Sequence, residues 1–185
     1  MVVRRLEVCL NSTSTTQARC QIVAEHIGRE NEHSLDGILA TFGEAARYDD
    51  EPWDAHYVGL QGVRTFYTQL LQALPDLHID VIRQHVAEHV IVVEVNLRGR
   101  HMGPWRGLPA TGRRIEFPLC GIYTFDQENR LAGEKIYYDR ATVLRQLGIF
   151  HEPESIRGRL ATAAMHPFSM ARTLVHNIAT LWRRS

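Results

Sequence analysis

Asp139 is the side chain whose position in this 185-residue sequence best suits proton transfer. It ends an alternating segment at 130–139, and because strand side chains alternate, it shares a face with Lys135 and Tyr137. If that face lines a pocket, desolvation raises the pKa of Asp139 towards that of a general base that removes a proton beside a carbonyl. The alternative is structural, because Asp139 directly precedes a helical segment and is a good N-cap residue.

His101 is the second candidate for chemistry. It has the same parity as Val93, Val95 and Leu97, which are expected to form the inner face of a strand. A neutral imidazole there would hydrogen-bond a substrate carbonyl or pass a proton to Asp139. The alternative is a loop histidine that bonds a backbone carbonyl.

Aromatic and acidic side chains supply candidate substrate contacts. A phenol at a pocket wall can stabilise an enolate oxygen, and Tyr123 and Tyr137 are placed for this, although a buried tyrosine is more often a core residue. Trp105 is expected at a pocket rim, with ordinary loop packing as the alternative. The acidic segment 48–53 adds Tyr48, Asp50 and Trp53 as contacts. Its spacing matches no metal loop, so a solvated loop is the better interpretation and no metal is expected.

Lys135 is the one lysine in the chain, beside 20 arginines. Facing a pocket next to Asp139, it would keep the carboxylate ionised and favour anion binding over proton abstraction. The opposite parity is also open, with Glu134, Ile136 and Tyr138 inward.

The elements that must position these residues follow from hydrophobic periodicity. Apolar residues at helical spacing predict helices at about 15–29, from about residue 35 with Ser34 as N-cap, and at 60–74, where Pro75 ends the helix. A short strand is expected between the second and third helices. After Pro75 the period changes to two, which predicts four consecutive antiparallel strands and then a closing helix that ends at Gly148. The order predicts an α+β fold.

Composition excludes several classes of protein. Twenty-one basic and 21 acidic side chains give zero net charge, which argues against a nucleic-acid-binding protein. The three cysteines show no CxxC spacing, so neither a disulfide framework nor a cysteine zinc site is expected. No apolar run is long enough to span a membrane, and the first 15 residues do not fit a secretory signal. We therefore expect a cytoplasmic protein.

Two motifs give the sequence a family resemblance. Residues 99–113, GRHMGPWRGLPATGR, contain a His-x-Gly element followed by a Pro-x-Thr-Gly-Arg turn. Residues 130–148, RLAGEKIYYDRATVLRQLG, combine a strand, an aspartate and a Leu-x-Gln-Leu-Gly helix. These motifs, together with the helix stop in 62–76, resemble the SnoaL-like polyketide cyclases of the NTF2-like superfamily.

The resemblance implies an α+β cone in which a curved antiparallel sheet packs against three N-terminal helices and encloses a pocket. It places the cyclases' acid/base aspartate at Asp139, and the lysine at Lys135 departs from the usual apolar or aromatic residue. It implies a cofactor-independent cyclase, isomerase or hydrolase acting on a small hydrophobic molecule, without nucleic acid or a membrane span, and a homodimer formed through the sheet. The alternative is a ligand-binding or assembly module without catalysis.

The expected organisation has three parts. An N-terminal extension covers 1–14 and the resemblance covers 15–150. Residues 151–185 would form a linker and an amphipathic C-terminal helix whose apolar residues fall on one stripe between 168 and 182.

Overall fold

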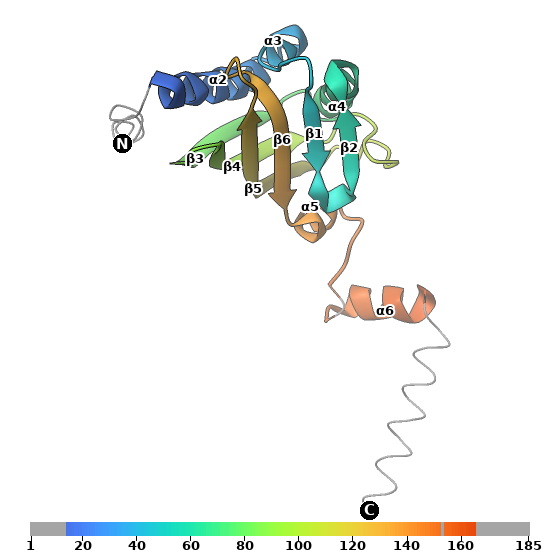
Figure 1. Cartoon of the computed structure of the whole chain (residues 1–185). Coiled ribbons are helices and arrows are strands. Elements are labelled where there is room, and N and C mark those ends of the chain that lie inside the picture. The colour runs from blue at the N-terminus through green and yellow to red at the C-terminus, as the bar shows by residue number, and fades with distance from the viewer. Residues whose placement is uncertain (1–13, 153, 166–185) are drawn as a thin grey trace, which may run out of the picture. The chain divides into compact units, whose positions relative to one another are not determined.

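The computed structural model describes residues 14–152 and 154–165 (Figure 1). The chain divides into two compact units between Leu147 and Gly148. The first unit contains helices α2 to α5 and all six strands, and the second contains α6. The first unit follows the order α2 (Ser14–Asn31), α3 (Leu35–Ala40), β1 (Arg47–Asp50), the 3-10 helix η2 (Glu51–Trp53), β2 (Ala55–Val58), α4 (Gly59–Ala73), β3 (His78–Val86), β4 (Val90–Arg100), β5 (Arg114–Phe125), β6 (Leu131–Tyr138) and α5 (Arg140–Gln146).

The six strands form one open, mixed sheet in the order β2-β1-β6-β5-β4-β3. Strands β3 to β6 pair antiparallel in sequence order, as the alternating segments predicted. The prediction of a wholly antiparallel sheet is wrong at one place, because β1 runs parallel to β6. Strand β2, which pairs antiparallel with β1, was not expected, since only four residues form it.

The predicted helices are present and their ends have the expected causes. The Ser34 side chain accepts a hydrogen bond from the Gly37 backbone N–H and so caps α3. Helix α4 ends before Pro75, which cannot continue a helix. After α5, Gly148 adopts a positive φ of 76°, the left-handed conformation that ends many helices.

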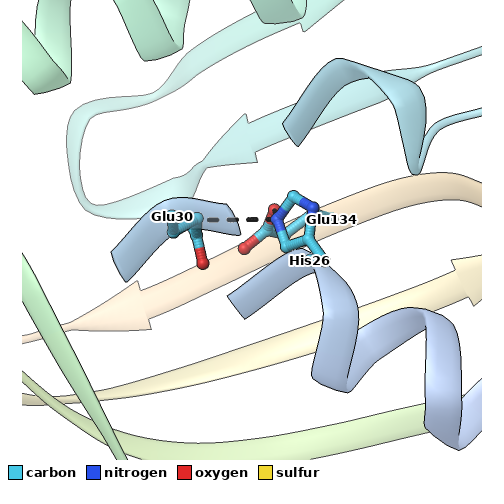
Figure 2. A group of neighbouring side chains, drawn as sticks. All are labelled: His26, Glu30 and Glu134. Atoms are coloured by element: carbon cyan, nitrogen blue, oxygen red, sulfur yellow. Dashed lines mark hydrogen bonds and ion pairs between the residues drawn. The ribbon is translucent and has the colours of Figure 1, made fainter. Parts of the chain in front are cut away.

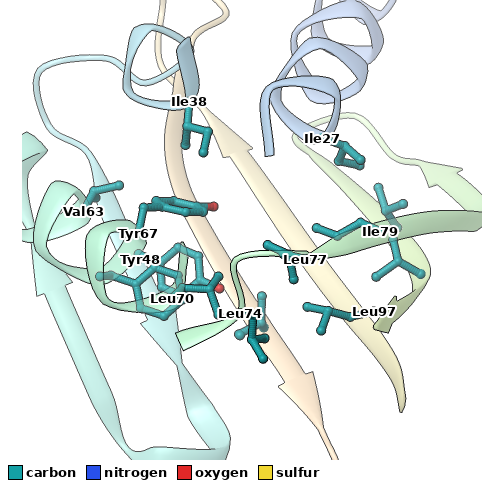
Figure 3. Close-up of a cluster of buried hydrophobic side chains, with 14 of the residues drawn as sticks. Ile27, Ile38, Tyr48, Val63, Tyr67, Leu70, Leu74, Leu77, Ile79 and Leu97 are labelled. Atoms are coloured by element: carbon teal, nitrogen blue, oxygen red, sulfur yellow. The ribbon is translucent and has the colours of Figure 1, made fainter. Parts of the chain in front are cut away.

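The core lies between the sheet and the helices α2, α3 and α4. Figure 3 shows Ile27 of α2, Ile38 of α3, Leu70 of α4 and Leu97 of β4 among the buried side chains of this core. Alternate residues of β4 are buried, from Ile91 to Leu97, which confirms the predicted inner face of that strand. The cone that this packing makes is the setting of the site.

The second unit holds helix α6 (Ile156–Met165), in a segment that the sequence suggested was a linker or weak helix. Ile156 and Leu160 on this helix are exposed. The predicted amphipathic C-terminal helix and nearly all of the N-terminal extension lie outside the described residues. Within the described parts of the chain, no helix combines the length and apolarity that crossing a membrane requires.

Candidate active site

A narrow cavity lies between the helices and the inner face of the sheet. Its volume is about 40 Å³, room for on the order of three water molecules. Most of its wall is apolar, from Phe66 and Leu70 of α4 to Val95, Leu97, Phe117 and Ile136 of the sheet. Among these side chains stand acidic and phenolic groups, namely Glu30, Tyr48, Asp50, Tyr123, Glu134 and Tyr138. Such a mixture of an apolar wall and a few polar groups is typical of small-molecule sites.

Three ionisable side chains meet beside the cavity (Figure 2), and two of them, Glu30 and Glu134, line it. His26 and Glu30 lie one turn apart on α2, and Glu134 comes from β6. The Nε2 atom of His26 lies 3.1 Å from Oε2 of Glu134 and 3.9 Å from Oε1 of Glu30. All three residues are buried, so their charges interact with little screening by water.

The surrounding hydroxyl groups show which protons His26 carries. The Thr41 hydroxyl donates to the Ile38 carbonyl at 2.6 Å, so at its 2.8 Å contact with His26 Nδ1 it must accept. The Tyr67 hydroxyl donates to Glu134 Oε2 at 2.8 Å, which leaves its oxygen to accept from His26 Nε2 at 3.0 Å. Both ring nitrogens therefore face acceptors, and the arrangement fits an imidazolium between acceptors and carboxylates.

Burial and neighbouring charge shift the pKa values of this cluster. Burial alone would lower the pKa of His26, but the charges of Glu30 and Glu134 outweigh it and raise the pKa. Burial is the largest cause that raises the pKa of Glu30, and the charge of Glu134 adds to this rise. The charge of His26 opposes it, and the resulting pKa is about 7. Glu30 is thus near half-protonated at neutral pH, which suits a group that both takes and gives a proton.

Phenols in the same wall keep their protons. Burial is the main cause that raises the pKa values of Tyr48, Tyr67 and Tyr123 well above the ordinary value, and the charge of Glu134 adds to it. Because Tyr48 and Tyr123 line the cavity, they can offer O–H donors to an oxygen of a bound molecule.

The cluster also has the donor atoms of a metal site. One atom from each of His26, Glu30 and Glu134 lies within 4.8 Å of the other two. A nitrogen and two carboxylate oxygens suit several divalent ions. Two of the three atoms are already hydrogen-bonded to each other, because Nε2 of His26 bonds Oε2 of Glu134, and it also bonds the Tyr67 hydroxyl.

A second polar group surrounds Asp50 at the end of β1. Arg106 donates to Oδ2 of Asp50 through Nη2 and to the Tyr57 hydroxyl through Nη1 at 3.0 Å. The guanidinium lies 5.6 Å from the centre of the Trp53 ring, and Trp53 Nε1 donates to the Tyr138 hydroxyl at 2.7 Å. Burial raises the pKa of Asp50, and the charge of Arg106 opposes that rise.

The comparisons with known proteins agree with this fold. The family model of the SnoaL-like polyketide cyclases matches residues 2–147. The chain is a member of this family. No curated protein matches significantly.

Solved structures show the same SnoaL-like fold. A putative SnoaL-like polyketide cyclase from Jannaschia sp. CCS1 superposes with a TM-score of 0.69 at 16% identity, over 76% of this chain and 99% of that one. AclR, a putative hydroxylase from Streptomyces galilaeus, superposes with a TM-score of 0.64 at 20% identity, over 74% of this chain and 99% of that one. SalBIII, an epoxide hydrolase/cyclase-like enzyme of pyran ring formation in the polyether salinomycin, superposes with a TM-score of 0.60 at 18% identity, over 68% of this chain and 94% of that one. At these identities the likeness establishes the fold.

Four of the predicted site residues line the cavity of this SnoaL-like chain: Tyr48, Asp50, Trp105 and Tyr123. Trp53 does not line it but contacts two residues that surround it, Tyr138 and Arg106. His101 is buried behind Trp105, with ring centres 6.2 Å apart, and is not part of the cavity wall. Burial lowers its pKa, and its Nδ1 atom accepts from the Thr111 backbone N–H at 3.3 Å.

Asp139, Tyr137 and Lys135 do not line the cavity. Of the two faces that the sequence left open for β6, the inner one carries Glu134 and Ile136. The Asp139 side chain is 61% exposed and accepts from the N–H groups of Ala141 and Thr142, as an N-cap does. Its neighbours Thr142 and Arg145 also keep its pKa low. Tyr137 is exposed, and Lys135 pairs with Glu51 at 3.0 Å.

An irregularity in β6 explains which face of this strand is buried. Thr124 pairs with Gly133 but Phe125 pairs with Leu131, so the ladder skips Ala132. A skipped residue resets the alternation of faces. Leu131 is buried, and beyond the irregularity the buried set becomes Glu134 and Ile136, which is the opposite parity that the sequence also allowed.

His26 and Glu30 were missed, although the sequence holds a signal for them. Val23 and Ile27 lie on the buried stripe of α2, and His26 and Glu30 follow each of them by three residues. Two ionisable residues within a buried helical stripe are unusual, because burying a charge costs free energy unless a partner is present. Their partner, Glu134, was named in the sequence only as part of the alternative parity.

Proposed function

We propose that this SnoaL-like protein transfers protons on a small, mainly apolar molecule that carries a carbonyl group, with Glu30 as the acid/base. The observation that supports this most is the pair Glu30 and Glu134, two buried carboxylates in one apolar cavity that share the His26 imidazole. A carboxyl group with a pKa of about 7 is well matched to proton transfer at neutral pH.

Each polar group has a role in this proposal. Ionised Glu30 takes a proton from the carbon beside the carbonyl, and the electron pair of that C–H bond forms an enolate. The phenol of Tyr123 or Tyr48 donates to the enolate oxygen. Protonated Glu30 then returns the proton, either to another carbon, which gives isomerisation, or to the alkoxide that forms when the enolate attacks a second carbonyl, which gives ring closure. In this proposal Asp139 caps helix α5 and is not the base.

Hydrogen exchange into simple ketones tests the proposal. The purified chain is mixed with cyclic ketones such as 1-tetralone in D₂O, and loss of the proton signal beside the carbonyl is followed by NMR. We expect exchange above the buffer rate and a loss of at least about 100-fold in Glu30→Gln. Glu25→Gln is the matched control, because Glu25 lies on the same helix but is exposed and pairs with Arg29.

The second candidate is a binding module without catalysis. The narrow cavity favours it, since its volume of about 40 Å³ requires wall side chains to move before a ring molecule enters. Binding of the ketones without exchange would support this candidate. Exchange that is equal in the native chain and in Glu30→Gln would contradict the acid/base role.

We also propose that the protein is a cytoplasmic homodimer that pairs through the outer face of the sheet. Residues of both charge signs lie on that face of β4, including Glu94, Asn96 and Arg98, which suits a polar contact between two copies. Sedimentation at micromolar concentration should give twice the chain mass of 21.2 kDa, and a monomer would refute the dimer.

A further inference from the structure

Asp50 lines the cavity and has one acceptor atom without a partner. Three buried side-chain atoms of the described residues have no hydrogen-bond partner: Asp50 Oδ1, His101 Nε2 and Arg106 Nε. Of these residues, only Asp50 lines the cavity. An unpaired buried polar atom costs free energy, so such an atom in a cavity wall points to a group that the site receives.

The partner of Asp50 fixes what that group must be. Arg106 holds Oδ2, so the carboxylate is the charged form and Oδ1 can only accept. The Tyr138 hydroxyl accepts from the Trp53 N–H, which leaves its own O–H free, and it is close enough to lower the pKa of Asp50. It nevertheless makes no hydrogen bond of normal geometry to Oδ1. The missing partner is therefore a donor, of which a hydroxyl is the simplest.

Strand register gives the backbone spacing between Asp50 and Glu134, the other buried carboxylate of the cavity wall. Asp50 of β1 pairs with Ile136 of β6, two residues beyond Glu134 on the same face. Two residues along a strand and one strand across place the Cα atoms of Asp50 and Glu134 about 8 Å apart. Apolar side chains, among them Phe66 and Ile136, share the cavity wall with them. One or two fused rings are long enough to cover that distance.

We propose that Asp50 Oδ1 is the recognition point for a hydroxyl group of the substrate. The substrate class is then a ring molecule with a reacting carbonyl near Glu30 and a hydroxyl at the Asp50 side. Arg106 acts as a positioning residue, because its bond to Oδ2 turns the other oxygen of Asp50 to the ligand. The carbonyl half of this description rests on the proposed function, whereas the hydroxyl half rests on Asp50 alone.

Calorimetric titration with a matched pair of ketones tests the hydroxyl. The native chain is titrated with 1-tetralone and with 6-hydroxy-1-tetralone. We expect the hydroxylated ketone to bind at least about tenfold more tightly, as a hydrogen bond to a charged acceptor allows. The variant Asp50→Asn lacks the charge of the acceptor, so the ratio of the dissociation constants of the two ketones should fall towards one.

Two further variants keep the result interpretable. Asp50→Asn leaves the Arg106 charge buried without its partner and can destabilise the fold. The double variant Asp50→Asn/Arg106→Gln removes both charges and should also show no preference. Glu30→Gln should lose hydrogen exchange while it keeps the preference for the hydroxylated ketone.

The outcomes separate the two proposals. Equal binding of the two ketones by the native chain, or binding of neither, overturns the recognition role of Asp50. A preference that persists in the double variant overturns it as well. A preference that depends on Asp50, found together with exchange that does not depend on Glu30, supports the recognition point and contradicts the proposed acid/base.

Discussion

The imidazole of His26 lies 3.1 Å from the carboxylate of Glu134, a residue of the cavity wall that is 108 positions away in the sequence. Tyr67 bonds both of them, and Thr41 holds the other ring nitrogen. Helix α2 and strand β6 are thus joined by a buried ion pair whose hydrogen bonds are satisfied, and Glu30 lies one helical turn away. This pair sets the electrostatic environment in which Glu30 works.

Replacing His26 by glutamine should be strongly destabilising, because it leaves two carboxylates buried without a cation. The loss of unfolding free energy at pH 7 is expected to be about 3–5 kcal/mol, measured by urea denaturation. Adding Glu134→Gln should recover part of the loss, since the two residues interact. His78→Gln is the control, because His78 is half-exposed beside Asp80. A cost below about 1 kcal/mol for the His26 variant would show that no ion pair is present.

Asp139 should be dispensable for proton transfer. Asparagine caps helices as well as aspartate does, so Asp139→Asn is expected to keep both the exchange rate, within about twofold, and the stability. Asp139→Ala should keep the exchange rate but lose about 1 kcal/mol of unfolding free energy through the lost cap. Abolished exchange in a folded Asp139→Asn variant would return the catalytic role to this residue.

Attaching a large group to the amine of Lys135 should leave the cavity and its proton exchange intact. It faces away from the cavity, is 42% exposed and pairs with Glu51, an exposed contact worth little. Because the chain has one lysine, an amine-reactive dye at high pH marks Lys135 and otherwise only the N-terminal amine. The labelled protein should exchange ketone protons at the native rate. A large loss of exchange upon labelling of Lys135, mapped by peptide mass, would place this lysine in the cavity.

Stability should fall as the pH rises from 5 to 8. The pKa of Glu30 is raised from the ordinary 4.5 to about 7, so the stability it contributes is full below 4.5 and is lost as the pH rises towards 7. The raised pKa of His26 acts in the same direction, because its charged form is the one that the fold favours. The contribution of Glu30 is about 3 kcal/mol.

Urea denaturation at several pH values measures this dependence. Glu30→Gln should flatten the decline between pH 5 and 8, whereas Glu25→Gln should leave it unchanged. A native chain whose stability is constant or rises over this interval would contradict the raised pKa of Glu30.

Most of the fold could be predicted from the sequence, but only part of the site. Helix caps and stops are local, so Ser34, Pro75 and Gly148 mark boundaries that the structure keeps. Strand alternation was correct for β4, where the ladder to β5 is regular. It left the inner face of β6 open, because the skipped Ala132 follows from the pairing of β6 with β5, a non-local property.

The acid/base cluster was hidden for a related reason. His26 and Glu30 look like exceptions within a buried stripe until Glu134 and Tyr67 are brought beside them by the packing of α2 and α4 on the sheet. A charge in a stripe signals a partner, but the sequence alone does not say which distant residue it is.

Glu30 is expected to titrate near neutral pH, and carbon NMR tests this without knowledge of the substrate. The protein is labelled with ¹³C at the glutamate carboxyl carbons, and their shifts are followed from pH 4 to 9 in the native chain and in Glu30→Gln. One carboxyl carbon of the native chain is expected to titrate with a midpoint at about 7, and this signal should be absent from the variant. Midpoints below about 5 for every glutamate of the native chain would contradict it.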